Sequence, residues 1–467
     1  MSFLDGRTAI AVVAAVALAI GCAGPVRADT IEAALVRSYQ NNPQLNAQRA
    51  SVRATDENVP QAMSGYRPRV AVTANANEQY SDTLTVTRGA NTNYTNLHGY
   101  NAPRSVGAQV TQNVFNGFQT SNRVRGAESQ VSAAREGLRV LEQTVLLSAA
   151  TIYMDYLRDA AIVEVQRSNV RVLEQTLKQV RDRFSVGEVT RTDVAQSEAQ
   201  LAAGNTQLLT AESNLTTTRA NFRRIIGNEP AALAPGTPVD RFLPGTLQAA
   251  IEVGMIQNPN VTAAMYGIDV AHLTVKVNEG ALFPTVNLVA SVQQSYESTL
   301  VSLKALSVTA GVQMSYQLYN GGAEYALIRQ SKETLAQQRL VLDQTRDQTR
   351  ATVTQNWGQL QAAKAQIASA QAQVTASETA LNGVREEARV GQRTTLDVLN
   401  AQQALVNARV NIVTAQHDRV VASYSVLAAI GRLAPSVLGL ATTVYDPTVH
   451  YHQVRDAWTG VRTPDGR

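Results

Sequence analysis

Two aspartates occupy equivalent positions in two copies of one motif. Asp193 stands six residues after Gly187, and Asp397 stands six residues after Gly391. A glycine at such a point permits the left-handed backbone turn that lets a helix end and the chain reverse. A carboxylate shortly afterwards can cap free backbone N–H groups at the start of the next helix and favours the helix dipole. The spacing therefore predicts two helix reversals, each followed by a capped return helix.

Residue types that carry out catalysis or bind metals form no comparable pattern. The five histidines are scattered, and the closest pair, His450 and His452, fits incidental metal binding or simple solvation. The sequence has no nucleophile elbow, no phosphate-binding glycine loop and no repeated carboxylate pair at helical spacing. Trp357 and Trp458 fit packing or an interface better than a binding site. We therefore expect no enzyme, no cofactor and no metal site.

The two motifs belong to a duplication that covers most of the chain. Asn42-Pro43 recurs as Asn258-Pro259 at a shift of 216 residues, whereas Val186-Gly187 recurs as Val390-Gly391 at a shift of 204. The shift changes once, between Tyr80 and Gly107. The first copy is therefore predicted to carry a surface loop that is 12 residues longer. A duplicated unit predicts a fold with internal pseudo-symmetry.

The chain divides into five segments. Arg7 precedes a short apolar run, and Val26-Arg27-Ala28 supplies the small residues that a signal peptidase requires. An alternative interpretation places a lipid on Cys22, the single cysteine. The predicted segments are a signal peptide at 1–28, a first repeat at 29–227, a Pro-rich linker at 228–245, a second repeat at 246–431 and a C-terminal tail at 432–467.

Very long helices dominate each repeat. Proline is absent between Pro103 and Pro230 and between Pro284 and Pro435, and apolar residues step by three and four in these stretches. We predict a helix over 118–184 that extends roughly 100 Å, followed by a return helix over 192–226. The same periodicity would suit a solvated coiled-coil stalk.

Short strands precede the long helices. In the segments 68–82 and 285–293 apolar residues alternate with polar ones, as expected where one face meets lipid and the other a wet lumen. A soluble sandwich would give the same alternation. Four strands cannot close a membrane barrel, and an open edge is not tolerated in lipid. If these strands enter a membrane, several chains must share one barrel, and three copies would give twelve strands.

These motifs together resemble the TolC family of outer-membrane efflux and secretion channels. The resemblance rests on the export signal, the two Asn-Pro pairs, the Phe115-Asn116-Gly117 and Tyr319-Asn320-Gly321 strand exits and the Val-Gly tips. It implies a mainly α fold with β, in which a homotrimer forms a twelve-stranded barrel in the outer membrane of a Gram-negative bacterium and a helical tunnel in the periplasm. The tail would be equatorial or disordered.

The resemblance also implies partners. They are a periplasmic adaptor protein, an inner-membrane pump of the ABC or RND type and outer-membrane lipid. Nucleic acid is not expected, because the formal charge of +4 is spread along the chain without a basic block. The alternative to an exit duct is a periplasmic coiled-coil scaffold or adaptor protein, which would be extracted without detergent.

Gating residues are carried over from the family one by one. By resemblance, Asp193 and Arg393 match a charged network that holds the entrance shut, and Asp397 matches a ring of carboxylates that constricts it. Three such carboxylates around one axis would attract cations. This chain departs from the family at Ala388, where relatives place a gating tyrosine, and at Asn400, where they place a second ring aspartate. We therefore expect the closed entrance to be held less tightly and the constriction to carry half the acidic charge.

Overall fold

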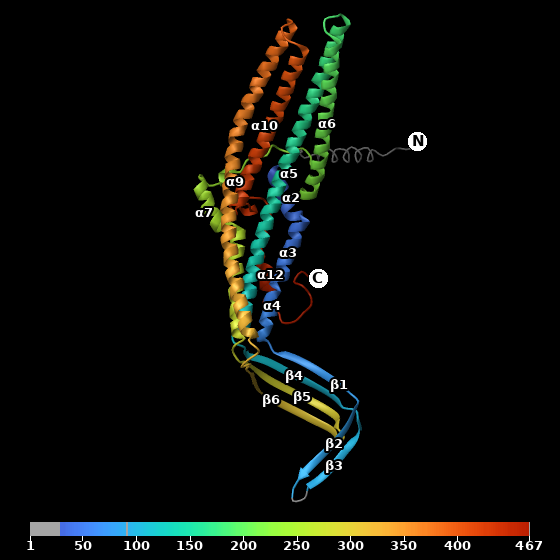
Figure 1. The fold of residues 1–467 in the computed structure, drawn as a ribbon, viewed down its shortest axis with the longest axis vertical. Helices are drawn as coiled ribbons and strands as arrows, with labels where there is room; N and C mark the ends of the chain where they lie inside the picture. The colour runs from blue at the N-terminus through green and yellow to red at the C-terminus, as the bar shows by residue number, and fades with distance from the viewer. Residues whose placement is uncertain (1–28, 90–91, 467) are drawn as a thin grey trace, which may run out of the picture. The chain divides into compact units, whose positions relative to one another are not determined.

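The computed structural model describes residues 29–89 and 92–466. The predicted signal peptide and Cys22 lie outside the described residues. The helices, in chain order, are α2 Ile31–Asn41, α3 Pro43–Asp56, α4 Asn58–Met63, η1 Ser64–Tyr66, α5 Gln119–Ser185, α6 Arg191–Ile226, η2 Asp240–Phe242, α7 Leu247–Gln257, α8 Pro259–Gly280, α9 Ala323–Arg389, α10 Thr395–Ala429, α11 Pro435–Leu438 and α12 Thr448–Val454. The strands are β1 Arg69–Ala76, β2 Gln79–Arg88, β3 Thr92–Asn101, β4 Arg104–Phe115, β5 Thr285–Thr299 and β6 Ser302–Ser315 (Figure 1).

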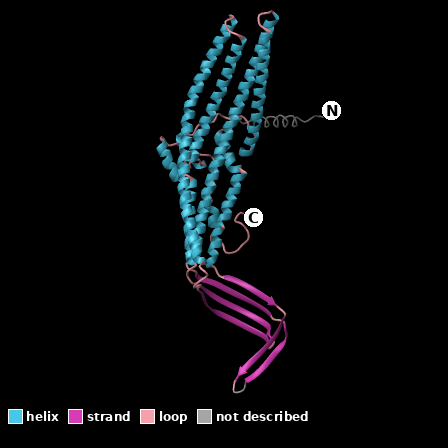
Figure 2. Cartoon of the chain, in the orientation of Figure 1, coloured by secondary structure: helices cyan, strands magenta, loops and turns pink. Residues whose placement is uncertain are grey.

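The duplication is visible in the element order. Each repeat has two helices broken at an Asn-Pro pair, then strands, then a helix of 67 residues and a return helix. The predicted long helix and return helix of the first repeat are confirmed as α5 and α6. Helices and strands alternate along the chain, but the strands of both repeats lie together (Figure 2). Within residues 29–89 and 92–466, no helix combines the length and apolar character needed to cross a bilayer.

Contacts divide the chain into two compact units, and each unit draws on both repeats. The first unit comprises residues 29–46, 140–258 and 349–444, and the second comprises 47–139, 259–348 and 445–466. Because α5 and α9 are so long, each contributes residues to both units. The sequence repeats and the contact units are therefore different divisions of one chain.

The four-stranded sheet of the second unit has one apolar face and one polar face. Its order is β1-β4-β5-β6, antiparallel throughout. Directly paired residues project from the same face. One row of paired residues consists of Val72, Ala108, Val292 and Val308, and the next row consists of Thr73, Gly107, Gln293 and Ser307. The register thus aligns the alternation of individual strands into two continuous faces.

The extra residues of the first repeat form a β-hairpin. The segment predicted as a surface loop contains β2 and β3, which pair from Gln79↔Asn101 to Arg88↔Thr92. The loop prediction was therefore wrong. Threonine and tyrosine favour extended backbone, and cross-strand contacts such as the 5.0 Å approach of the Tyr80 and Tyr100 rings support the pairing. In the second repeat only residues 300–301 separate β5 from β6.

Small and medium apolar side chains form the helical core. On α5 the apolar residues Val170, Leu173, Leu177 and Val180, which step by three and four along the sequence, are buried, as the coiled-coil spacing predicts. Phe184, the next position in the pattern, is exposed because the helix ends one residue later. The tail forms α11 and α12 and contributes buried residues such as Leu433 and Val454.

Candidate functional site

Each long helix reverses through a five-residue turn, residues 186–190 after α5 and 390–394 after α9. Gly187 and Gly391 have φ angles of 80° and 81°, the left-handed region that costs other residues energy. The Glu188 N–H donates to the Arg183 carbonyl oxygen, and the Gln392 N–H donates to that of Glu387. These bonds satisfy carbonyl groups left free at the helix ends. Gly187 and Gly391 thus each lie in the turn between a long helix and its return helix.

Capping boxes begin both return helices. At α6 the Thr190 hydroxyl accepts a hydrogen bond from the Asp193 N–H, and the Asp193 carboxylate accepts one from the Thr190 N–H at 2.9 Å. Thr394 and Asp397 repeat this arrangement at α10, with the corresponding N–H to carboxylate distance at 3.0 Å. The predicted capping role of both aspartates is confirmed. The two threonines were missed, although Thr-x-x-Asp before a helix is their sequence signal.

Hydrogen bonding holds both aspartates ionised. The hydroxyl and backbone N–H of Thr190 lower the pKa of Asp193 below its ordinary value. The backbone N–H and hydroxyl of Thr394 lower the pKa of Asp397 in the same way. Each tip therefore carries a fixed negative charge at neutral pH. Asn400, one turn beyond Asp397 on α10, is exposed and neutral.

The arginine expected to pair with Asp193 has another partner. Arg393 Nε lies 2.9 Å from Glu387 Oε2, and this bond raises the pKa of the arginine. At the other tip Arg183 binds Glu188 at 3.0 Å. Across the described residues no ion pair joins Arg393 to Asp193. Each tip turn is thus bridged by its own Arg–Glu pair.

Amide side chains connect the two helical hairpins. The Gln200 side chain on α6 donates to Gln403 on α10 at 3.1 Å. The Gln402 side chain on α10 donates to Asn169 on α5 at 3.4 Å, and it accepts from Arg385 on α9. Asn169 and Gln402 are buried. These links leave no sequence signal, because exposed and buried glutamines look alike in a sequence rich in them.

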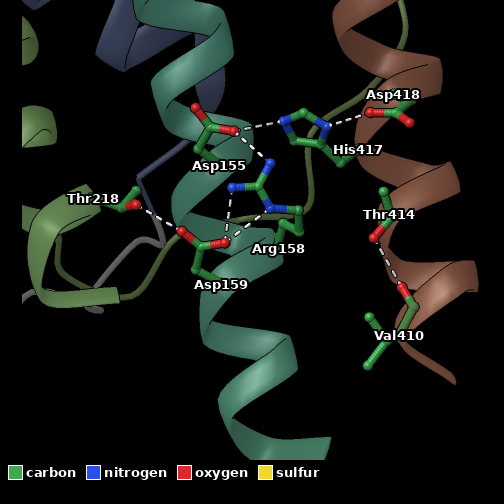
Figure 3. A network of polar contacts seen from close by, with 8 residues as sticks. All are labelled: Asp155, Arg158, Asp159, Thr218, Val410, Thr414, His417 and Asp418. Atoms are coloured by element: carbon green, nitrogen blue, oxygen red, sulfur yellow. Dashed lines mark hydrogen bonds and ion pairs between the residues drawn. The ribbon is translucent and has the colours of Figure 1, made fainter. Parts of the chain in front are cut away.

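A partly buried charge cluster joins α10 to α5 and α6 farther from the tips. His417 Nε2 lies 2.9 Å from Asp155 Oδ1, and His417 Nδ1 lies 2.9 Å from Asp418 Oδ1 (Figure 3). Arg158 contacts both Asp155 and Asp159 at 2.8 Å. Asp159 also accepts a hydrogen bond of 2.6 Å from the Thr218 hydroxyl of α6.

Protonation is favoured at this histidine. Burial lowers the pKa of His417, but the hydrogen bonds to Asp155 and Asp418 outweigh burial and raise that pKa above its ordinary value. A charged imidazole can donate to both carboxylates at once. Three helices from two repeats thus meet at one set of charged side chains.

Comparison with known proteins identifies the family. A family model described as outer membrane efflux protein matches residues 34–228 and 252–432. The chain belongs to this family. The outer membrane efflux protein BepC of Brucella suis is 40% identical over 440 residues, which cover 94% of this chain and 93% of BepC. The alkaline protease secretion protein AprF of Pseudomonas aeruginosa is 24% identical over 406 residues, which cover 84% of this chain and 83% of AprF.

Solved structures agree on the fold. The outer membrane channel CmeC of Campylobacter jejuni aligns with a TM-score of 0.75 at 14% identity, over 91% of this chain and 89% of CmeC. VceC of Vibrio cholerae aligns with a TM-score of 0.72 at 18% identity, over 86% of this chain and 96% of VceC. The expected TolC-like α/β fold is confirmed.

Family membership settles the broad function. The chain is an outer-membrane channel protein of the efflux and type I secretion class. Its family consists of channels, which are not enzymes. The channel interpretation is therefore favoured over the periplasmic scaffold or adaptor.

Proposed function

We propose that three copies of this chain form one exit duct, with a shared twelve-stranded barrel and a helical tunnel that ends at the tip turns. The apolar face of the four-stranded sheet carries the proposal. That sheet has β1 and β6 as its two edges, and lipid does not tolerate unpaired strand edges. Pairing β1 of one copy with β6 of the next satisfies both edges, and three copies give an even strand number in the range of membrane barrels.

The duct conducts passively and has no catalytic residues. A periplasmic adaptor protein and an inner-membrane pump of the ABC or RND type engage it and open its entrance. Relatives named for efflux and for protease secretion support this assignment. Outer-membrane lipid surrounds the barrel.

The entrance is gated by the tips. Asp193 and Arg393 take part in the lock, and Asp397 contributes one carboxylate per copy to a ring around the axis. In the single chain Arg393 binds Glu387. Arg393 must therefore release Glu387 before it can bind a carboxylate of another copy. Because Asn400 is neutral, Asp397 supplies the only layer of negative charge in the ring. Ala388 supplies no hydroxyl to the lock, so the entrance opens more readily than in relatives that have a tyrosine there.

The first test is the mass and bilayer conductance of the protein purified in detergent. A trimer that forms discrete, cation-preferring pores supports the proposal. A monomer without pore activity contradicts it.

Crosslinking tests the strand pairing. We would combine Val72→Cys in β1 with Val308→Cys, Ala310→Cys or Val312→Cys in β6, since the register between copies is set only in the trimer. At least one pair should give a covalent trimer under oxidising conditions. Ala108→Cys replaces the β1 cysteine in the control, because β4 has both edges paired within its own sheet. Trimers in the control alone, or in neither set, would refute the shared barrel.

A further inference from the structure

From residue 445 onward the C-terminal tail belongs to the second unit and contacts its helices. His450 of α12 lies 3.0 Å from the fully buried Asp56 of α3. Tyr451 packs against the apolar cluster that contains Val59 and Val131. Beyond α12, Arg455 lies 3.5 Å from Glu128 of α5. Residues 450–455 of the tail are therefore held against three helices, α3, α4 and α5.

The next contact brings the tail to the start of the sheet. Arg67 Nη1 donates to the Ala457 carbonyl oxygen at 2.6 Å. The Arg67 guanidinium carbon also lies 4.8 Å from the centre of the Trp458 ring, a cation–π geometry. Arg67 precedes β1 by two residues. Trp458 is consequently held at the end of the sheet where strands connect to helices.

An exposed aromatic side chain lies near that end of every strand in the sheet. Each strand has one exposed aromatic residue within three residues of its helix-side end: Tyr66 for β1, Phe118 for β4, Phe283 for β5 and Tyr316 for β6. Membrane barrels carry such aromatic girdles at the level of the lipid headgroups. Trp458 remains 67% exposed in spite of its contact with Arg67, and the nearby Val461 is fully exposed.

We infer that the C-terminal tail is a lipid-surface anchor in which Arg67 holds Trp458 at the headgroup level of the membrane, beside the aromatic ring of the barrel. The inference rests on the proposed function, because it needs the sheet to lie in a bilayer. Tryptophan suits this position, since its ring is apolar and its N–H can reach water or headgroups. The occupant of this surface is phospholipid, and a neighbouring copy of the chain is the alternative that the test addresses.

Tryptophan fluorescence gives a direct test, because the chain has two tryptophans. The full protein with Trp357→Phe retains Trp458 as its one reporter. The matched control with Trp458→Phe retains Trp357, which packs against the helical cluster of Leu360 and Val426. Both are reconstituted in phosphatidylcholine vesicles with bromine atoms at carbons 6 and 7 or at carbons 11 and 12 of the acyl chain.

We expect at least a twofold loss of Trp458 emission with the shallow bromines, a smaller loss with the deep ones and little change for Trp357. Arg67→Gln should reduce the quenching and shift the Trp458 emission to the red. Equal emission from Trp458 in brominated and ordinary vesicles would overturn the anchor. If acrylamide also fails to quench Trp458, a neighbouring copy covers it and the anchor is equally overturned.

A third reporter separates this inference from the proposed channel. Val308→Trp, in a background that lacks both natural tryptophans, places the reporter on the apolar face of β6, and Tyr316→Trp offers a second position if that variant does not assemble. Quenching of these reporters without quenching of Trp458 would overturn the anchor and leave the channel intact. Absence of quenching at all three would refute the membrane placement of the sheet itself.

Discussion

His417 Nε2 and Asp155 Oδ1 lie 2.9 Å apart, which links the return helix α10 of the second repeat to the long helix α5 of the first. The residues are 262 positions apart in the chain. Asp418 contacts the other ring nitrogen, and Arg158 Nη1 lies 2.8 Å from the same Oδ1 atom of Asp155. A change in the charge of His417 therefore acts on the contact between two of the longest helices.

The first prediction concerns pH. Because the pKa of His417 is raised in the folded protein, its stabilisation is fully present below the ordinary histidine pKa of about 6.5 and is lost as the pH rises through the folded value. His417→Gln should destabilise the protein by about 2 kcal/mol at pH 5.5, with a smaller effect at pH 8.5. Thermal unfolding midpoints measured across this range check the prediction.

The exposed His272 on α8 supplies the control. His272→Gln should leave the midpoint and its pH dependence close to those of the unaltered protein. A His417→Gln effect that grows as the pH rises would have the wrong sign and would contradict the charged imidazole.

The second prediction concerns the tip glycines. At Gly187 and Gly391 an added methyl group would meet no atom within 4 Å, so the cost of alanine is that of the left-handed backbone alone. Each substitution should destabilise the protein by about 1 to 2 kcal/mol. Gly383 of α9 also has open space around it but lies within a helix. There alanine should stabilise by up to about 1 kcal/mol. Equal shifts in unfolding midpoint at Gly187 and Gly383 would show that backbone conformation does not control the tips.

Local sequence patterns predicted the long helices well and the β2–β3 hairpin poorly. Burial at Val170 and Leu173 repeats within one helix, so spacing along the chain reveals it. In β2, Leu84 and Val86 alternate with threonines, but β3 is rich in polar residues and shows no such alternation. One short alternating stretch without a matching partner stretch does not reveal a hairpin. These strands are fixed by hydrogen bonding to each other, and the sequence of either strand alone does not show which residues will pair.

The candidate site shows the same limit. Gly187, Asp193 and their counterparts were found because turns and caps depend on neighbours a few residues away. The Glu387 partner of Arg393 lies across the turn, and resemblance to a family pointed to Asp193 instead. Asp155, one of the two partners of His417, comes from a distant helix of the other repeat. Only the folded arrangement brings such residues together.

The third prediction separates the lock from ordinary surface charge. Arg393→Ser should raise the open fraction of single channels, because the serine can no longer bind a carboxylate at the tip. Arg389 is an exposed arginine four residues earlier, paired with Glu386 at 3.0 Å. Arg389→Ser removes the same charge and should leave the open fraction unchanged. Bilayer recordings of both variants at equal salt provide the measurement, and an equal rise in both would reduce the effect to net charge.

The last prediction concerns the constriction. Asp397→Asn keeps an acceptor oxygen for the Thr394 N–H while removing the charge that the lowered pKa maintains. It should weaken the block of single-channel current by divalent cations. Asp193→Asn makes the same change in the other capping box and should leave cation block nearly unchanged. Unaltered block in Asp397→Asn would remove Asp397 from the ring.

Asn400→Asp tests the same assignment by gain of function. Asn400 lies three residues after Asp397 on α10, and residues at that spacing project from one face of a helix. In a trimer the substitution adds three carboxylates one turn away from the first three, which should strengthen cation block and raise its dependence on ionic strength. The increase in cation block should be smaller when Asp397→Asn is present in the same chain, because the trimer then carries three carboxylates around the axis and not six. Stronger block from Asn400→Asp that is independent of salt would point to a change in pore shape and contradict the electrostatic ring.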